Sequence, residues 1–157
     1  MKYGCFGNAP GNTTAANAGI ISINNAGSAP ISAPRIYEWE IGPAANSADN
    51  TYTVRVKRNT TAGTFTSITP SSVDNKTSVS LTVSGNQSTV VGGADVELMR
   101  AGFHMRGGYR WVAIPGGELA VFGAVSKGIF IEYIFADLNS LSTCSGSLKM
   151  AEPFGVL

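Results

Sequence analysis

The chain has little of what most catalytic and metal sites require, because its 157 residues include one histidine and two cysteines. A single His excludes metal sites built from several histidines and relays that need two imidazoles. Cys5 and Cys144 lie near opposite ends and are too few for a disulfide-dense secreted scaffold or a close-spaced zinc site. We therefore expect no metal and no cofactor, and reduced thiols rather than a disulfide that staples the two ends.

An excess of charge of one sign is also missing. Eleven Lys and Arg against ten Asp and Glu give a net charge of +1, with no block of like charge, so no strong field gathers polyanions. We expect neither direct nucleic-acid binding nor an anionic membrane as partner. No apolar run approaches the roughly 18 residues of a membrane span, and the first residues lack the apolar core of a signal peptide.

Small polar residues and alternating apolar residues dominate what is present. The 19 glycines, with frequent Ser, Thr and Asn, favour turns and strands over a helical bundle. Three segments alternate apolar and polar residues with the period of a strand that has one solvated face. Their apolar positions are Tyr37, Trp39 and Ile41; Tyr52, Val54 and Val56; and Val79, Leu81 and Val83.

Four later segments are more continuously apolar, which is typical of strands buried on both faces in the middle of a sheet. They span residues 96–103, 109–114, 118–122 and 129–135. Turn signals rich in Gly, Pro and Asn separate the segments at short intervals. The sequence therefore predicts an all-β fold, an antiparallel β-sandwich that is jelly-roll-like, over residues 36–136.

The two ends of the chain differ from this core in composition. Residues 1–35 and 137–157 are rich in Gly, Ser, Asn and Ala and carry few apolar residues, too few to offset the entropy of ordering them alone. We predict an extended N-terminal arm and a C-terminal tail that become ordered against neighbouring molecules. Their candidate interface residues are Ile20, Ile21 and Ile23 in the arm and Leu148 and Phe154 in the tail.

His104 has a basic neighbourhood. Arg100, Arg106 and Arg110 surround it, and in a nearly neutral protein such arginines favour the carboxylates of a partner over phosphate. We add these three to the candidate interface residues. A Ser-His-Asp triad is arithmetically possible, but no Gly-x-Ser-x-Gly motif accompanies it. We expect His104 to be a strand residue that is hydrogen-bonded at a surface or an interface.

Three glutamates offer the remaining route to catalysis. Glu38 and Glu40 project from one strand face, and Glu132 could lie on a neighbouring strand, so a carboxylate pair of the glycosidase type is conceivable. Pairing of the two strand glutamates with Arg55 and Lys57 is the simpler interpretation. We therefore predict that the chain is not an enzyme.

Four aromatic residues suggest a binding function. Tyr37, Trp39, Tyr109 and Trp111 could line a flat platform on which sugar rings stack, as in carbohydrate-binding modules. Their alternation with polar residues favours core packing instead. The glycan platform stays as an alternative hypothesis.

Two segments resemble small structural proteins encoded in tailed-bacteriophage genomes. The first is IYEWEIGPAANSADNTYTVRVKRNTTAGTFTSITPSSVDN, residues 36–75, and the second is RGGYRWVAIPGGELAVFGAVSKGIFIEYIF, residues 106–135. The order of pieces carries the resemblance: a Glu-Trp-Glu-Ile strand, an Ala-Asp-Asn turn, a Val-Arg-Val-Lys-Arg strand, then Tyr-Arg-Trp-Val-Ala-Ile-Pro-Gly-Gly-Glu and a last apolar strand.

The resemblance implies a virion component, a jelly-roll or related sandwich that decorates or cements the capsid surface after synthesis in the host cytoplasm. The implied partners are the major capsid protein and further copies of the chain. A homotrimer would suit the local three-fold positions of an icosahedral shell, and no small-molecule substrate is expected. Two alternatives remain: a carbohydrate-binding module or adhesin, and a small jelly-roll coat protein that assembles by itself.

Overall fold

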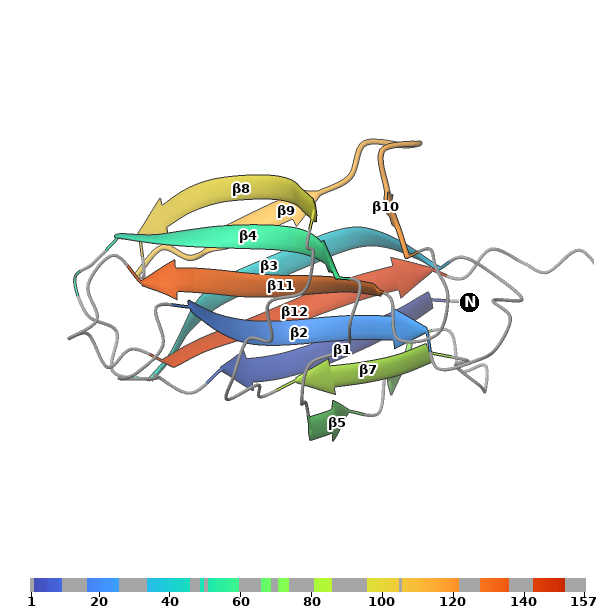
Figure 1. Ribbon diagram of the computed structural model, residues 1–157, viewed down its shortest axis with the longest axis horizontal. Helices are drawn as coiled ribbons and strands as arrows, with labels where there is room; N and C mark the ends of the chain where they lie inside the picture. Colours follow the sequence, from blue (N-terminus) through green and yellow to red (C-terminus); the bar gives the residue numbers. More distant parts are fainter. Residues whose placement is uncertain are drawn as a thin grey trace, which may run out of the picture.

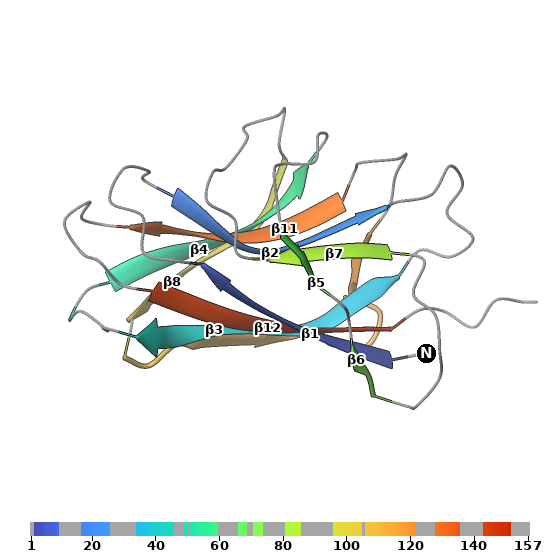
Figure 2. The same cartoon turned by 90° about the horizontal axis from the view of Figure 1, so that it is seen from below.

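The protein is built from β-strands, as predicted, and the computed structural model contains no helix within the residues that it describes. These are residues 2–9, 17–25, 34–45, 49, 51–59, 66–68, 71–73, 81–85, 96–104, 106–121, 128–135 and 143–151. Twelve strands in this part of the chain form two antiparallel sheets, which Figure 1 shows from the side and Figure 2 from below.

Sheet A brings together segments that are far apart in the sequence. Its order is β10-β3-β12-β1-β6, and β9 pairs with β3 along the same edge as β10. The strands are β1 (Lys2–Ala9), β3 (Arg35–Ala45), β6 (Ser71–Ser72), β9 (Tyr109–Val112), β10 (Leu119–Ala120) and β12 (Thr143–Ala151).

Sheet B has the order β5-β7-β2-β11-β4-β8. The strands are β2 (Asn17–Asn25), β4 (Thr51–Asn59), β5 (Thr66–Ile68), β7 (Leu81–Gly85), β8 (Val96–His104) and β11 (Gly128–Phe135). The two sheets lie face to face as two layers in Figure 2, and β1 and β12 of sheet A contact β2 of sheet B.

One apolar core fills the space between the sheets. In β4, Tyr52, Val54 and Val56 are buried while the residues between them are partly exposed, because successive side chains of a strand point to opposite faces. This confirms the strand predicted from their alternation. The largest fully buried side chains are Trp39, Tyr3, Tyr52, Ile21, Ile23, Ile36, Ile129, Leu148 and Met150.

Strands occupy much of the predicted arm, residues 1–35, and tail, residues 137–157, which corrects the prediction there. Strand β1 lies between β12 and β6, β2 lies between β7 and β11, and β12 lies between β3 and β1. Tyr3, Cys5 and Cys144 are buried, so these segments supply core residues instead of waiting for a partner. The remainder of the arm and tail, residues 1, 10–16, 26–33, 137–142 and 152–157, lies outside the described residues.

The prediction that the later apolar segments lie in the middle of a sheet is right for β11 and wrong for three other strands. Strand β8 is the last strand of sheet B, and β9 and β10 form an edge of sheet A. Strand β8 covers the end of the core from sheet B, and β9 and β10 cover it from sheet A. This accounts for the run of apolar residues in these three strands. Leu98, Met99, Tyr109, Trp111 and Leu119 are partly buried against that core.

Candidate functional site

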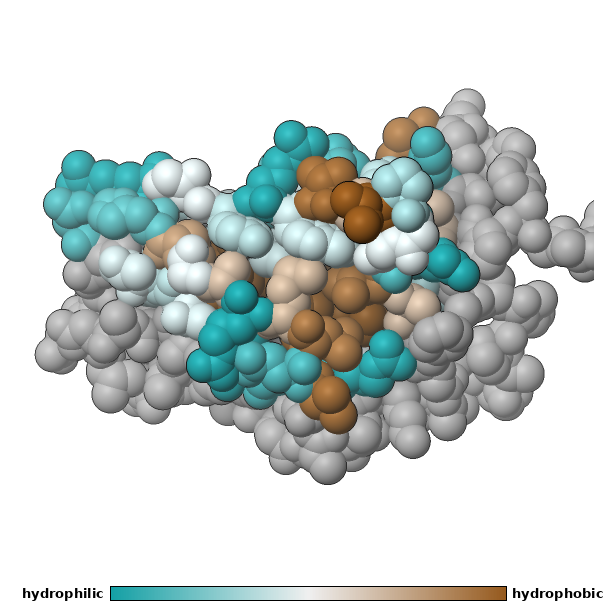
Figure 3. All heavy atoms as spheres, turned by 90° about the horizontal axis from the view of Figure 1, so that it is seen from above, coloured by the Kyte–Doolittle hydropathy of each residue, from teal (hydrophilic) through white to brown (hydrophobic). Residues whose placement is uncertain are grey.

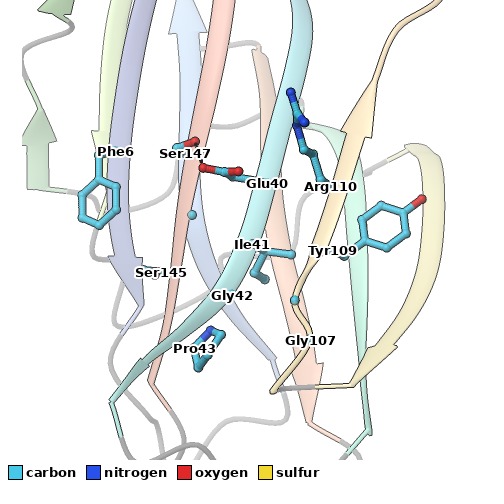
Figure 4. A pocket seen from close by; sticks show the side chains of 12 residues that line it. Phe6, Glu40, Ile41, Gly42, Pro43, Gly107, Tyr109, Arg110, Ser145 and Ser147 are labelled. Carbon is cyan, nitrogen blue, oxygen red and sulfur yellow. Dashed lines mark hydrogen bonds between the residues drawn. The ribbon is translucent and has the colours of Figure 1, made fainter.

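A hollow of about 300 Å³ lies on the outer face of sheet A and is the first candidate site. We call it the Phe6 groove. Figure 4 shows Phe6 of β1 on one side, Arg110 of β9 on the other, and Glu40 of β3 facing Ser147 of β12 between them. The remaining lining residues are Ile41, Gly42, Pro43, Gly107, Gly108, Tyr109, Ser145 and Gly146.

The end of the groove is shaped by the turn that links β8 to β9. The backbone N–H groups of Gly107 and Gly108 both donate to the carbonyl oxygen of His104, at 3.0 Å each. Gly108 has φ +66°, and a Cβ there would lie 2.6 Å from the carbonyl oxygen of Ile41. Only glycine therefore lets this turn close onto β3. The Gly107-Gly108 pair is a turn, as predicted.

Two cations neutralise Glu38 beside the groove. Its Oε1 accepts hydrogen bonds from Arg110 Nε at 2.9 Å and Lys149 Nζ at 3.0 Å, and its Oε2 accepts from Lys149 Nζ at 3.0 Å. The Lys149 ammonium, and then the Arg110 guanidinium, hold the pKa of Glu38 below its usual value although burial opposes them. This ion-pair group joins β3, β9 and β12.

A second hollow, of about 360 Å³, adjoins the first on the other side of Phe6. Gly4, Ser71 and Val73 line it together with Phe6 and Ser147, so the two hollows share a wall. Phe6 is 58% exposed, which is unusual for a large aromatic side chain. The outer face of sheet A thus has two adjoining hollows that share the exposed Phe6 ring.

The edge formed by β8, β9 and β10 is the second candidate surface, and we call it the β8–β9 edge. Val96, Val112 and Ile114 are exposed there, Ile114 at 77%, next to the partly buried Leu98 and Trp111. Figure 3 views the molecule from above, the side on which β8, β9 and β10 lie in Figure 1, and shows brown apolar residues bordered by hydrophilic ones. An apolar centre with a polar rim is the usual arrangement of a protein interface.

The predicted arginines lie along this edge. Arg100 belongs to β8, Arg106 to the turn, and Arg110 to β9, and all three are exposed. Arg100 donates to both carboxylate oxygens of Glu97 at 2.8 and 2.7 Å, which lowers the pKa of Glu97. Each arginine therefore already has a carboxylate of the chain nearby, since Arg106 Nε lies 3.8 Å from Asp49 Oδ1 and Arg110 pairs with Glu38.

His104 ends β8 at the surface, where it is hydrogen-bonded as predicted. Its Nδ1 accepts from the backbone N–H of Arg106 at 3.3 Å, and its Nε2 lies 2.9 Å from Asp49 Oδ1. These contacts fix the turn rather than assemble a nucleophile.

The three glutamates do not lie together on one sheet. Glu38 and Glu40 do share the outer face of sheet A, but Glu132 lies in β11 of sheet B. Glu132 is fully buried, contacts Arg55 Nη2, and lies 3.1 Å from Lys57 Nζ. Arg55 and Lys57 therefore pair with Glu132 and not with the β3 glutamates, which corrects the predicted partners. The reason is that β3 and β4 belong to different sheets.

The predicted apolar interface residues are mostly unavailable to a partner. Ile21, Ile23 and Leu148 are each 1% exposed or less, so their prediction as interface residues is wrong. They point inward because they occupy the positions of β2 and β12 that face the core between the sheets. The side chain of Ile20 and all of Phe154 lie outside the described parts of the structure.

The predicted glycan platform is not assembled as one exposed surface. Trp39 is 0% exposed and packs against Tyr109 and Trp111, with ring centroids 5.3 and 6.3 Å apart. Tyr37, Tyr109 and Trp111 are only partly buried. Pairing of β3 with β9 brings Tyr109 and Trp111 beside Trp39, so the buried Trp39 is not available as part of an exposed platform.

Sequence reasoning did not single out Phe6, Ser145 or Ser147 as site residues. A signal existed in the tail, where Cys144, Gly146, Leu148 and Met150 are all buried and alternate with Ser145, Ser147 and Lys149. This period of two predicts a strand. In β1, Tyr3 and Cys5 alternate with Gly4 and Phe6 in the same way.

Comparison with protein-family models, with curated proteins and with solved structures found no match to this chain. Among the described residues, no three His, Cys, Asp or Glu side chains gather as a metal site would need. The same part of the chain holds no helix long and apolar enough to cross a membrane.

Proposed function

We propose that the chain is a structural protein of a virus particle, a decoration or cement protein at the capsid surface, built on a jelly-roll sandwich. The strand order carries this proposal. Strands β1-β12-β3-β9 follow one another in sheet A, and β2-β11-β4-β8 follow one another in sheet B. Eight strands in two interleaved Greek keys define the jelly roll, a fold of viral capsid and lectin domains.

The path of the chain supports the same assignment. Strands β1, β2, β3 and β4 alternate between the sheets, as do β8, β9, β11 and β12. The short strands β5, β6 and β7 then form an insertion after β4 that widens both sheets at the edge opposite β8 and β9. A fold alone does not determine a function. The resemblance of residues 36–75 and 106–135 to tailed-phage structural proteins supplies the second support.

The β8–β9 edge is the surface that we assign to the shell and to further copies of the chain in a homotrimer. Val96, Val112 and Ile114 on this edge are large apolar side chains that the core does not bury, and apolar residues gathered on a surface suit a protein interface. The arginines beside them form a polar rim whose carboxylate partners can be exchanged for those of a neighbour. This edge takes the role that the sequence assigned to the terminal arms, and no catalytic step is part of the proposal.

Sedimentation of virus particles tests the proposal. Particles from the source that encodes the chain are purified, probed with antibodies against the chain, and labelled with immunogold. We expect the chain on the outer surface of the particles, and a chain that stays entirely in the soluble fraction would contradict the proposal. Closed shells formed by the purified chain alone would instead identify a coat subunit.

Matched variants locate the interface in the same assay. A Val96→Asp and Ile114→Asp double variant places charge on the β8–β9 edge, where both side chains are exposed. Val73→Asp is the control, because Val73 is 62% exposed and follows β6 at the opposite edge of sheet A. We expect the double variant to lose attachment and the trimer, measured by analytical ultracentrifugation, and the control to keep both.

A further inference from the structure

We propose that the Phe6 groove is a binding site for one ring of a neutral saccharide. The groove meets the β8–β9 edge assigned to the shell only at the turn before β9 and the first residues of that strand, where Gly107, Gly108, Tyr109 and Arg110 line it. Its volume of about 300 Å³ lies at the lower limit of small-molecule sites. The proposal concerns different residues from the aromatic platform and stands independently of the virion function.

The exposed ring of Phe6 supplies the apolar wall. It stands between two hollows with more than half of its surface exposed, so burial in the core does not account for it. A flat aromatic face beside a cavity suits the C–H face of a pyranose, which buries apolar surface while the hydroxyl groups around the ring stay free for hydrogen bonds.

A carboxylate with a fixed orientation supplies the polar wall. The Ser147 hydroxyl donates to Glu40 Oε1 at 2.8 Å, and Figure 4 shows the two side chains meeting inside the groove. Glu40 Oε2 has no hydrogen-bond partner among the described residues. A carboxylate oxygen only accepts hydrogen bonds, so the ligand must present donors, which sugar hydroxyl groups are.

The charge balance around the groove favours a neutral ligand. Arg110 and Lys149 both pair with Glu38, and Glu40 adds a second carboxylate, so two negative and two positive charges lie in or beside the groove. An anion would meet the Glu40 carboxylate, and a cation would meet the Arg110 guanidinium, which also lines the groove. A polyol meets neither penalty.

The floor of the groove lets a ligand approach the backbone. Gly42 lies at its centre, and a Cβ built on Gly42 would meet nothing within 4 Å. Gly108 is fixed as glycine by its contact with the Ile41 carbonyl oxygen. A ligand can therefore lie close against β3 at Gly42.

The open space above Gly42 allows a sharp experiment. Gly42→Leu should fill the groove without a clash at Cβ, and Phe6→Ala removes the stacking ring from an exposed position. Gly102→Leu is the matched control on the outer face of sheet B, where a Cβ would lie 3.9 Å from the Tyr52 carbonyl oxygen, an ordinary contact. A dispersed amide spectrum shows that each variant is folded.

The full chain, labelled with ¹⁵N, is titrated with galactose and N-acetylglucosamine as neutral probes, glucosamine as the cationic probe and glucuronate as the anionic probe. We expect at least one neutral sugar to shift the amide signals of Gly42, Gly108 and Ser147, with a Kd of roughly 1–10 mM. Gly42→Leu and Phe6→Ala should weaken this binding by about tenfold or more, whereas Gly102→Leu should leave it unchanged within about twofold.

Three results would overturn the proposal: no groove signal moves with either neutral sugar, Gly42→Leu binds as the wild type does, or a charged sugar binds better than the neutral ones. None of these results bears on the virion function, because Gly42→Leu should still attach to particles through the β8–β9 edge. Conversely, a chain absent from particles could still bind sugars in this groove.

Discussion

Replacement of Ile23 by alanine separates a core strand from an extended arm. Ile23 is 0% exposed and lies in β2 between β7 and β11. Removal of a fully buried Ile side chain to Ala costs about 2–5 kcal/mol, from lost burial and from the cavity that remains. A domain of this size is stable by about 5–15 kcal/mol, so the variant should stay folded with a large part of its stability lost.

Urea denaturation measures this loss directly. With an m-value of about 2 kcal/mol per molar, the midpoint should fall by about 1–2.5 M. Ile114→Ala is the matched control, because the same atoms are removed from a side chain that is 77% exposed; it should change the free energy of unfolding by less than about 0.5 kcal/mol. If Ile23→Ala behaved like this control, residues 17–25 would be an arm after all, and the sheet order proposed for sheet B would be wrong.

Three further predictions concern the turn, the ion pairs and the thiol. Gly108→Ala should lower the free energy of unfolding by about 2–3 kcal/mol, because φ is +66° and the Cβ meets the Ile41 carbonyl oxygen. Gly116→Ala is its control in the same urea assay. Gly116 has φ +85° with open space around it, so this substitution should lower the free energy of unfolding by only about 1 kcal/mol. The pKa of Glu38 is lower in the folded chain than the usual 4.5, so its ion pairs stabilise the fold above that pH and cease to do so as pH falls through the lower folded value. Wild type should be more stable than Glu38→Gln at neutral pH, and the difference should shrink as pH falls below 4.5. Burial raises the pKa of Cys5 to about 12, so a thiol reagent at about pH 8 should leave Cys5 unmodified in the native chain and label it after unfolding, as peptide mapping would show; rapid labelling of the native chain would mean that β1 is not packed as described.

Much of the fold class was predictable, because the alternation in β3 and β4 is regular. Tyr52, Val54 and Val56 point to the core as their spacing predicts, and the Gly107-Gly108 and Gly116-Gly117 pairs form turns. Composition averaged over a window does not reveal the strands at the two ends. Small residues such as Gly4 and Gly146 hide the alternation of Tyr3, Cys5 and Leu148.

The site was less predictable than the fold, because it depends on which strands become neighbours. Glu40 and Ser147 are separated by more than a hundred residues and meet only because β3 pairs with β12. Period-two patterns indicate that a strand has an inner and an outer face, but they do not give its partner. The same gap explains why Glu132 was placed near the wrong glutamates and why Trp39 was considered for a surface role.

The pairing of the first strand with the last has a practical consequence. Lys2 stands opposite Ala151 in the β1–β12 ladder, so the first described strand begins beside the residue at which the last one ends. A short linker joining Lys2 to Ala151 would close the chain between them into a ring, and new ends could be cut at the exposed Pro115-Gly116 turn without breaking a single ladder. Cargo fused at Lys2 and Ala151 would lie beside β1 and β12, whereas a chain reopened at this turn would carry it at the β9 and β10 edge of sheet A.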